Sequence, residues 1–242
     1  MASTANHTPP IAEPSPDRAP EVLVLLAHPA LEQSRVNQRL LRAIADLGSA
    51  PASTARIGVR DLYALYPDYL IDVQAERSLL ATAQLVVWQH PIHWYGMPPL
   101  MKLWLDEVLG FGWAYGPGGH ALAGKHLWLV ASTGSPEEAY HPSGHNRYFF
   151  DAFLPPYEQT ATLCGMRFLP PLLLHGAHRV DEAELNAHAA LYARRLASHP
   201  DWPELADLAE CPACVVPPLA RPSDITNDTP PALAQAPVGR AA

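Results

Sequence analysis

The chain has 242 residues, of which 48% are hydrophobic and 17% charged, enough for one domain with a sizeable core. Its formal net charge of −8 disfavours a nucleic-acid partner. No apolar run approaches the roughly 20 residues of a membrane span, and three cysteines argue against a disulfide scaffold, so we expect a cytoplasmic protein.

Proline marks the limits of the folded part. The 27 prolines cluster before Glu21 and after Trp202, which predicts poorly ordered tails over residues 1–20 and 201–242 and one domain over residues 21–200. The second tail carries Cys211 and Cys214 in a Cys-x-x-Cys spacing, which can be redox-active or half of a zinc site. No second pair follows it, so we interpret it as incidental and predict no metal site.

The first predicted strand is the apolar run 21–27, typical of a strand that is buried on both faces of a parallel sheet. A loop beginning at His28 follows, and then a helix whose apolar side begins at Leu40. Ser34, Arg35 and Asn37 stand where this helix starts, and its backbone N–H groups and dipole would attract phosphate. Alternatively, Ser34 only caps the helix.

The middle of the chain contains an unusual aromatic loop. Residues 54–60 weakly predict a second strand, residues 72–83 a helix and residues 85–89 a third, buried strand. The loop from His90 to Gly96 carries Trp94 and Tyr95 and precedes a helix that opens with two prolines. Aromatic rings at the carboxyl end of a strand suit a flat ligand, although they could simply cover the sheet edge.

The remaining segments complete an alternating pattern. The glycine-rich stretch 110–119 is a candidate lid, and residues 125–131 predict a fourth strand that ends in a loop of small residues. Residues 148–165 predict a long helix interrupted around Pro155 and Pro156. Residues 167–175 predict a fifth strand, whose two prolines place it at an edge, and residues 181–198 a last helix.

Strands that alternate with helices predict an α/β fold with a doubly wound, five-stranded parallel sheet. The loops that begin at His28, His90 and Ser132 would then meet at one switch point. The first loop offers hydrogen-bond donors for an anion, and the second offers aromatic surface. The third offers small residues together with Tyr and His. This combination suits a phosphate joined to a flat heterocycle, as in a flavin mononucleotide.

The same loops carry a resemblance to a known family. The matching segments include 27–29, 63–68, 87–104, 112–119, 132–134 and 164–171, within a region of about residues 21–200. The chain resembles the flavodoxin-like NAD(P)H:quinone oxidoreductases of the DT-diaphorase and modulator-of-drug-activity type. Within them it is most similar to the ancillary flavoproteins of Kef glutathione-regulated potassium-efflux antiporters.

The resemblance implies a set of site residues. The flavin phosphate and ribityl chain would contact His28, Ser34, Val36 and Asn37. The isoalloxazine would contact Pro91, Ile92, His93, Trp94 and Tyr95, and its pyrimidine end would contact Ser132, Thr133, Gly134 and Ser135. Tyr140 would be catalytic, with His145 rather than His141 as its companion, and Tyr115 would join these two at the substrate. Ser135 stands where the family usually has glycine, and its side chain would narrow the approach to the flavin.

The implied activity is that of an FMN-dependent NAD(P)H dehydrogenase (quinone), with FAD as the alternative flavin. NAD(P)H would deliver hydride to flavin N5 and leave, and a quinone would then take it in a ping-pong reaction. Family members are homodimers. A second interpretation is a regulatory subunit of a Kef-type potassium/proton antiporter, on the cytoplasmic face of the inner membrane, and a third is a one-electron flavodoxin.

Overall fold

A computed structural model describes residues 20–49 and 56–205 of the chain. Cys211 and Cys214 lie outside the described residues, as do residues 1–19 and 206–242. The strands are β1 (Val22–Leu26), β2 (Ile57–Asp61), β3 (Leu85–Pro91), β4 (His126–Ser132) and β5 (Arg167–Leu174). The α-helices are α1 (Arg35–Ser49), α2 (Leu62–Leu65), α3 (Val73–Thr82), α4 (Pro99–Val108), α5 (Pro155–Leu163) and α6 (Glu182–Ser198), with 3₁₀ turns at Leu31–Gln33, Glu137–Ala139, Phe150–Phe153 and Pro203–Leu205.

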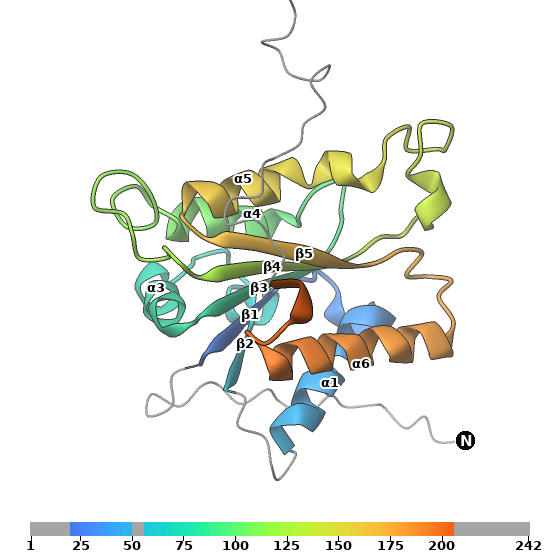
Figure 1. The fold of residues 1–242 in the computed structure, drawn as a ribbon, viewed down its shortest axis with the longest axis horizontal. Helices are drawn as coiled ribbons and strands as arrows, with labels where there is room; N and C mark the ends of the chain where they lie inside the picture. Colours follow the sequence, from blue (N-terminus) through green and yellow to red (C-terminus); the bar gives the residue numbers. More distant parts are fainter. Residues whose placement is uncertain (1–19, 50–55, 206–242) are drawn as a thin grey trace, which may run out of the picture. The chain divides into compact units, whose positions relative to one another are not determined.

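The five strands form one parallel sheet in the order β2-β1-β3-β4-β5 (Figure 1). Every residue of β1 and β3 is buried, as the apolar runs 22–26 and 85–88 predict, and the burial of β3 extends to the polar residues Gln89 and His90. The predicted doubly wound α/β fold is confirmed. The edge position of β5 is confirmed as well, and its prolines are tolerated there because an edge strand needs fewer ladder donors.

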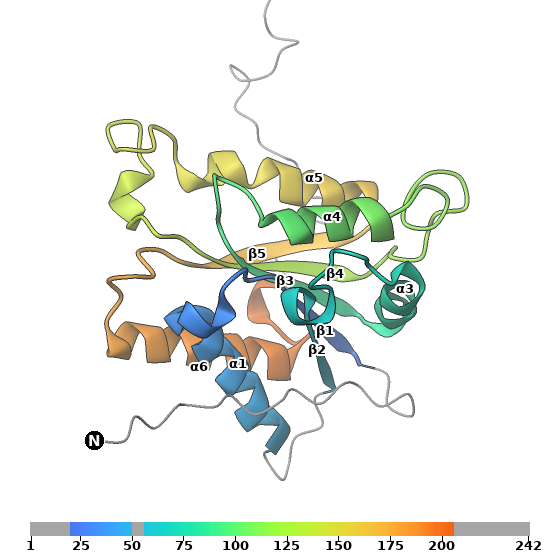
Figure 2. The ribbon, with the colours of Figure 1, turned by 180° about the vertical axis from the view of Figure 1, so that it is seen from behind.

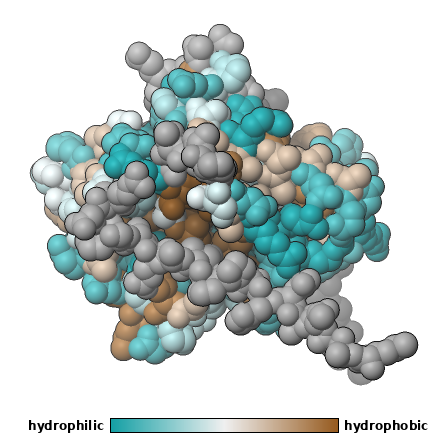
Figure 3. Space-filling model, turned by 90° about the horizontal axis from the view of Figure 1, so that it is seen from below, coloured by the Kyte–Doolittle hydropathy of each residue, from teal (hydrophilic) through white to brown (hydrophobic). Residues whose placement is uncertain are grey.

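Helices cover both faces of the sheet. Helices α1 and α6 lie on one face and α3, α4 and α5 on the other, as the two opposite views show (Figures 1 and 2). Each face has its own core: Val24 and Tyr192 belong to the α1/α6 side, and Trp88 and Trp104 to the other. Seen from the α1/α6 side, hydrophilic residues cover much of the surface, and apolar residues show in patches between them (Figure 3).

A buried ion pair fastens the helices of the second face. The Glu76 side chain on α3 is fully buried and accepts hydrogen bonds from Arg60 Nε (3.0 Å) and Nη2 (2.7 Å) and from the Tyr66 hydroxyl (2.6 Å). Its other oxygen accepts from Trp104 Nε1 on α4 at 3.1 Å. One carboxylate thereby connects β2, α3 and α4, the helix that follows the aromatic loop.

The structure departs from the expected elements in three places. Pro155 and Pro156 begin α5 rather than interrupt a helix, because Pro fits a first turn whose N–H groups have no partner. The expected connection after β2 contains the short helix α2, capped by Asp61. The folded part also includes residues after 200: Trp202 packs against Trp128 with ring centroids 4.8 Å apart.

No helix in residues 20–49 and 56–205 combines the length and apolar character that a transmembrane span requires.

Candidate functional site

The candidate site lies at the carboxyl edge of the sheet. The connection after β1 runs to β2 on one side of the sheet, and the connection after β3 runs to β4 on the other side, so a switch point lies between β1 and β3. A cavity of about 460 Å³ opens there, within the size range of ligand pockets. Its lining consists of His28, Pro29, Ala30, Gln33, Ser34, Arg35, Val36, Pro91, Ile92, His93, Ser132, Thr133, Gly134, Ala177 and His178.

The first wall is the start of α1. Ser34 Oγ accepts hydrogen bonds from the Asn37 backbone N–H and from Asn37 Nδ2, both at 3.1 Å, so this serine does cap the helix. Asn37 is buried beneath it and accepts from Gln89, which in turn accepts from Tyr192. The cap therefore rests on a hydrogen-bonded chain that crosses to β3 and α6.

The second wall is a tight turn between His93 and Gly96. The two residues exchange backbone hydrogen bonds of 2.9 and 3.1 Å. Trp94 and Tyr95 form the centre of the turn with φ of 48° and 64°, the left-handed region that Asn and Gly normally occupy there. Trp94 is 95% exposed, so burial of its ring does not explain this conformation. Strain of this kind is typical of functional sites.

The third wall is the loop after β4. Thr133 is buried, its N–H donates to the Leu174 carbonyl, and its hydroxyl donates to the Ser135 carbonyl at 2.7 Å. Gly134 lines the cavity close to the ring of His178. The loop is therefore held from within and by the end of β5.

A fourth segment, which the sequence analysis did not include, follows β5. Ala177 and His178 line the cavity, and the Ala177 N–H donates to the Thr133 carbonyl at 2.8 Å. Gly176 allows the chain to turn here with φ of 67°. The only sequence signal was a His-Gly pair after the last strand, which by itself indicates a turn.

Uncommitted backbone donors distinguish this edge. Among the described residues, the N–H groups of Arg35, Val36, Trp94, Tyr95, Gly134 and Ser135 have no intramolecular partner. They form one pair on each of the three predicted loops. No Asp or Glu of the described chain lines the cavity, whereas three imidazoles and one guanidinium do. The arrangement suits an anionic ligand with several hydrogen-bond acceptors.

Burial favours the neutral form of one cavity histidine, His28. It lowers the pKa of His28, and the nearby His93 lowers it further while Glu32 opposes both. His28 Nδ1 accepts from the Ala30 N–H at 3.1 Å, as a neutral ring can. The Arg35 guanidinium binds Glu182 at 2.6 Å and the Val180 carbonyl at 3.2 Å, which fixes the first turn of α1 against α6.

Nine of the predicted residues line the cavity: His28, Ser34, Val36, Pro91, Ile92, His93, Ser132, Thr133 and Gly134. Asn37, Trp94, Tyr95 and Ser135 adjoin it in the chain. Tyr115 packs edge-on against Phe111 in the glycine-rich loop and does not line it.

The predicted pairing of Tyr140 with His145 is not seen. Tyr140 is only 8% exposed, and its ring contacts Phe150, Phe153 and His175. His145 is exposed, and no ring contact or hydrogen bond of its side chain is found among the described residues. The imidazole that lies against Tyr140 is that of His175, with ring centroids 5.3 Å apart.

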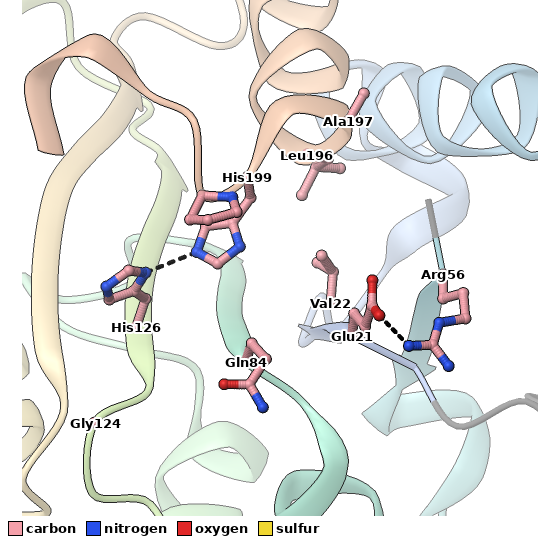
Figure 4. Close-up of a pocket in the computed structure, with 10 residues that line it drawn as sticks. Glu21, Val22, Arg56, Gln84, Gly124, His126, Leu196, Ala197 and His199 are labelled. Atoms are coloured by element: carbon pink, nitrogen blue, oxygen red, sulfur yellow. Dashed lines mark hydrogen bonds and ion pairs between the residues drawn. The ribbon is translucent and has the colours of Figure 1, made fainter. Parts of the chain in front are cut away.

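A second cavity, of about 480 Å³, lies at the amino edge of the sheet (Figure 4). Four of its polar side chains form two pairs: Glu21 pairs with Arg56, and His126 Nδ1 lies 2.7 Å from His199 Nε2. Ligands of open α/β sheets bind at the carboxyl ends of strands. The smaller cavity with unpaired donors is therefore the better candidate.

Comparison with known proteins agrees with this geometry. The profile of a family described as having a flavodoxin-like fold matches residues 20–196. The chain belongs to this flavodoxin-like family. A curated relative, the glutathione-regulated potassium-efflux system ancillary protein KefF of Salmonella schwarzengrund strain CVM19633, is 42% identical over 184 residues. The alignment covers 76% of this chain and 98% of the relative.

Two solved structures are similar to the chain in both sequence and fold. General stress protein 14 of Treponema denticola, in complex with FMN, is 39% identical with a TM-score of 0.66, over 73% of this chain and 98% of that protein. An NADPH-quinone reductase from P. pentosaceus is 25% identical with a TM-score of 0.65, over 74% and 98% of the two chains. The resemblance predicted from the sequence is confirmed.

Proposed function

We propose that the chain is an FMN-dependent NAD(P)H:quinone oxidoreductase. The observation that carries the proposal is the set of uncommitted N–H groups that three loops bring around one cavity. The FMN complex of the Treponema relative and the quinone reductase from P. pentosaceus support it.

The residues present fit FMN. The N–H groups of Arg35 and Val36 at the first turn of α1 would bind the phosphate, beside the Ser34 hydroxyl. The N–H groups of Gly134 and Ser135 provide fixed dipoles that stabilise negative charge on a ligand.

The aromatic turn would orient a planar ring. The backbone of Trp94 and Tyr95 offers donors, and Tyr95 is itself fixed because it stacks on Phe153 at 5.1 Å. Bound FMN supplies the two-electron redox chemistry that connects a nicotinamide to a quinone, and the protein orients the reactants and excludes water.

The test begins with the absorbance spectrum of protein that has been reconstituted with FMN. We expect flavin bands that survive gel filtration, bleach when NADH or NADPH is added under nitrogen, and return when a quinone follows. Failure to retain FMN would refute the cofactor assignment. Retained FMN that NAD(P)H does not bleach would refute the dehydrogenase activity, and bleached flavin that quinones do not reoxidise would refute the acceptor.

A second candidate function is that of an ancillary subunit of a Kef-type antiporter at the cytoplasmic face of the membrane. The identity of 42% across 98% of KefF favours it. Exposed aromatic side chains at Phe111, Tyr148 and Phe149 offer apolar contact surface. Antiporter-dependent sedimentation with membrane vesicles and stimulated potassium efflux would support this role, and their absence would refute it. Light scattering tests the expected homodimer.

A further inference from the structure

The hydrogen bonds of Thr133 fix the tautomer of a neighbouring histidine. Thr133 Oγ1 lies 2.7 Å from the Ser135 carbonyl and 3.0 Å from His175 Nδ1. A hydroxyl has a single hydrogen, and a carbonyl can only accept, so that hydrogen goes to Ser135. His175 Nδ1 must therefore carry a hydrogen and donate it to Thr133.

His175 is held in the orientation that this bond requires. It follows the last residue of β5, and its ring contacts Phe150 at 5.1 Å and Tyr140 at 5.3 Å. Burial lowers the pKa of His175, against the opposing effect of Glu137 and Glu138, which favours the neutral ring. The imidazole is thus a fixed, uncharged donor.

The bond acts on the loop whose amides adjoin the cavity. Two further bonds join the same segments, from Gly176 N–H to the Ser135 carbonyl (2.9 Å) and from Ala177 N–H to the Thr133 carbonyl (2.8 Å). Together these bonds occupy the carbonyls of Thr133 and Ser135 and leave the N–H groups of Gly134 and Ser135 uncommitted. A small movement of Thr133 would displace these two donors, and a misplaced donor binds a ligand less well.

We infer that His175 is a positioning residue of the flavin site, which acts through Thr133 to hold the Gly134 and Ser135 amides in place. It does not line the cavity, so it orders the site without touching the ligand. The inference rests on the proposed function, since it takes FMN as the ligand of those amides.

Two substitutions separate the donor of His175 from its ring. His175→Asn keeps an N–H donor near the Nδ1 position but removes the ring, and His175→Phe keeps the ring but removes the donor. We expect His175→Phe to weaken FMN affinity about 10-fold, the effect of one lost hydrogen bond, and His175→Asn to stay within about 3-fold of the wild type. His120→Phe, at an exposed position, is the matched control and should bind FMN as the wild type does.

The readout is a titration of apoprotein with FMN in the absence of substrate, and quenching of flavin fluorescence reports binding. Thr133→Val should weaken FMN affinity at least as much as His175→Phe, because it also removes the hydroxyl bond to the Ser135 carbonyl. The double variant should bind no more weakly than Thr133→Val alone, because the bond to His175 is already absent there. Equal losses in the Asn and Phe variants would overturn the inference, since the ring rather than the donor would then matter. Wild-type affinity in His175→Phe would overturn it as well.

One measurement keeps this test separate from that of the proposed function. Nitrogen-15 chemical shifts of the histidines in wild-type apoprotein report which ring nitrogen is protonated, without any flavin. We expect the Nδ1–H form for His175, and an Nε2–H form would overturn the inference even if every variant failed to fold. Wild-type protein that shows the Nδ1–H form but does not bind FMN would refute the proposed function and, with it, this role of His175.

Discussion

Glu76 provides the sharpest test of how this fold is held together. Glu76→Gln keeps one acceptor oxygen but places an NH₂ group against Arg60, Tyr66 or Trp104, all of which donate to this carboxylate. It also leaves the largely buried Arg60 guanidinium without its counter-ion. Burial, together with the Glu76 carboxylate, raises the pKa of Tyr66 to about 12, so the phenol is neutral near neutral pH and offers Arg60 no replacement charge.

The expected loss is large. Removal of one partner of a buried ion pair destabilises a protein by about 3–5 kcal/mol. At about 2–4 °C per kcal/mol for a domain of this size, the melting temperature of Glu76→Gln should fall by roughly 6–20 °C. Glu107→Gln, on the exposed side of α4, is the control and should change the free energy of unfolding by less than about 0.5 kcal/mol.

Urea unfolding of apoprotein, monitored by far-ultraviolet circular dichroism, gives the free energy of unfolding of both variants. Because the cost comes from an uncompensated charge, the double variant Arg60→Met/Glu76→Met should lose less stability than the sum of its two single variants. A loss below about 1 kcal/mol in Glu76→Gln, or simple additivity in the double variant, would contradict this account of the network.

Three further changes test the site. Replacing Trp94 and Tyr95 with Asn and Gly should raise the melting temperature of apoprotein, because it relieves strain of about 1–3 kcal/mol per residue, and should weaken FMN binding in the same titration. Ser34→Ala should cost about 1 kcal/mol in urea unfolding through the lost cap and also weaken FMN binding; unchanged affinity would leave Ser34 as a cap alone. Burial lowers the pKa of His90 to about 4, so folding favours its neutral imidazole. The stability that this imidazole contributes is complete above pH 6.5, the pKa of an unfolded histidine, and is lost as the pH falls toward 4. Unfolding free energies at pH 7, 5.5 and 4.5 should therefore depend less on pH in His90→Phe than in the wild type, and parallel profiles would refute this.

The sheet could be predicted because its strands are encoded locally. A strand that is buried on both faces is typically an apolar run, and such runs make up β1 and the first four residues of β3. The edge position of β5 followed from its prolines. Two prolines within a helical pattern match both an interruption and a helix start, and only packing decides that Pro155 and Pro156 begin α5.

The polar contacts could not be predicted in the same way. Glu76 resembles any solvated acid in an amphipathic helix, since its partners Arg60 and Trp104 lie 16 and 28 residues away in the chain. His175 reaches Thr133 across 42 residues only because β4 and β5 pair in parallel. Sequence therefore indicated which loops meet at the carboxyl edge, whereas the layer of side chains behind them depends on strand register.

That layer also contains Tyr140. Family resemblance assigns it direct support of charge on the flavin ring, but its ring is enclosed by Phe150, Phe153 and His175, and its hydroxyl bonds to Thr133. Burial raises the pKa of Tyr140, so the phenol is a neutral group at physiological pH. Tyr140 and His175 thus share Thr133 as their partner and belong to one support behind the loop. In the proposed complex, charge on the flavin would be met by backbone amides whose positions are fixed, and we expect the tyrosine and histidine to keep those amides from moving.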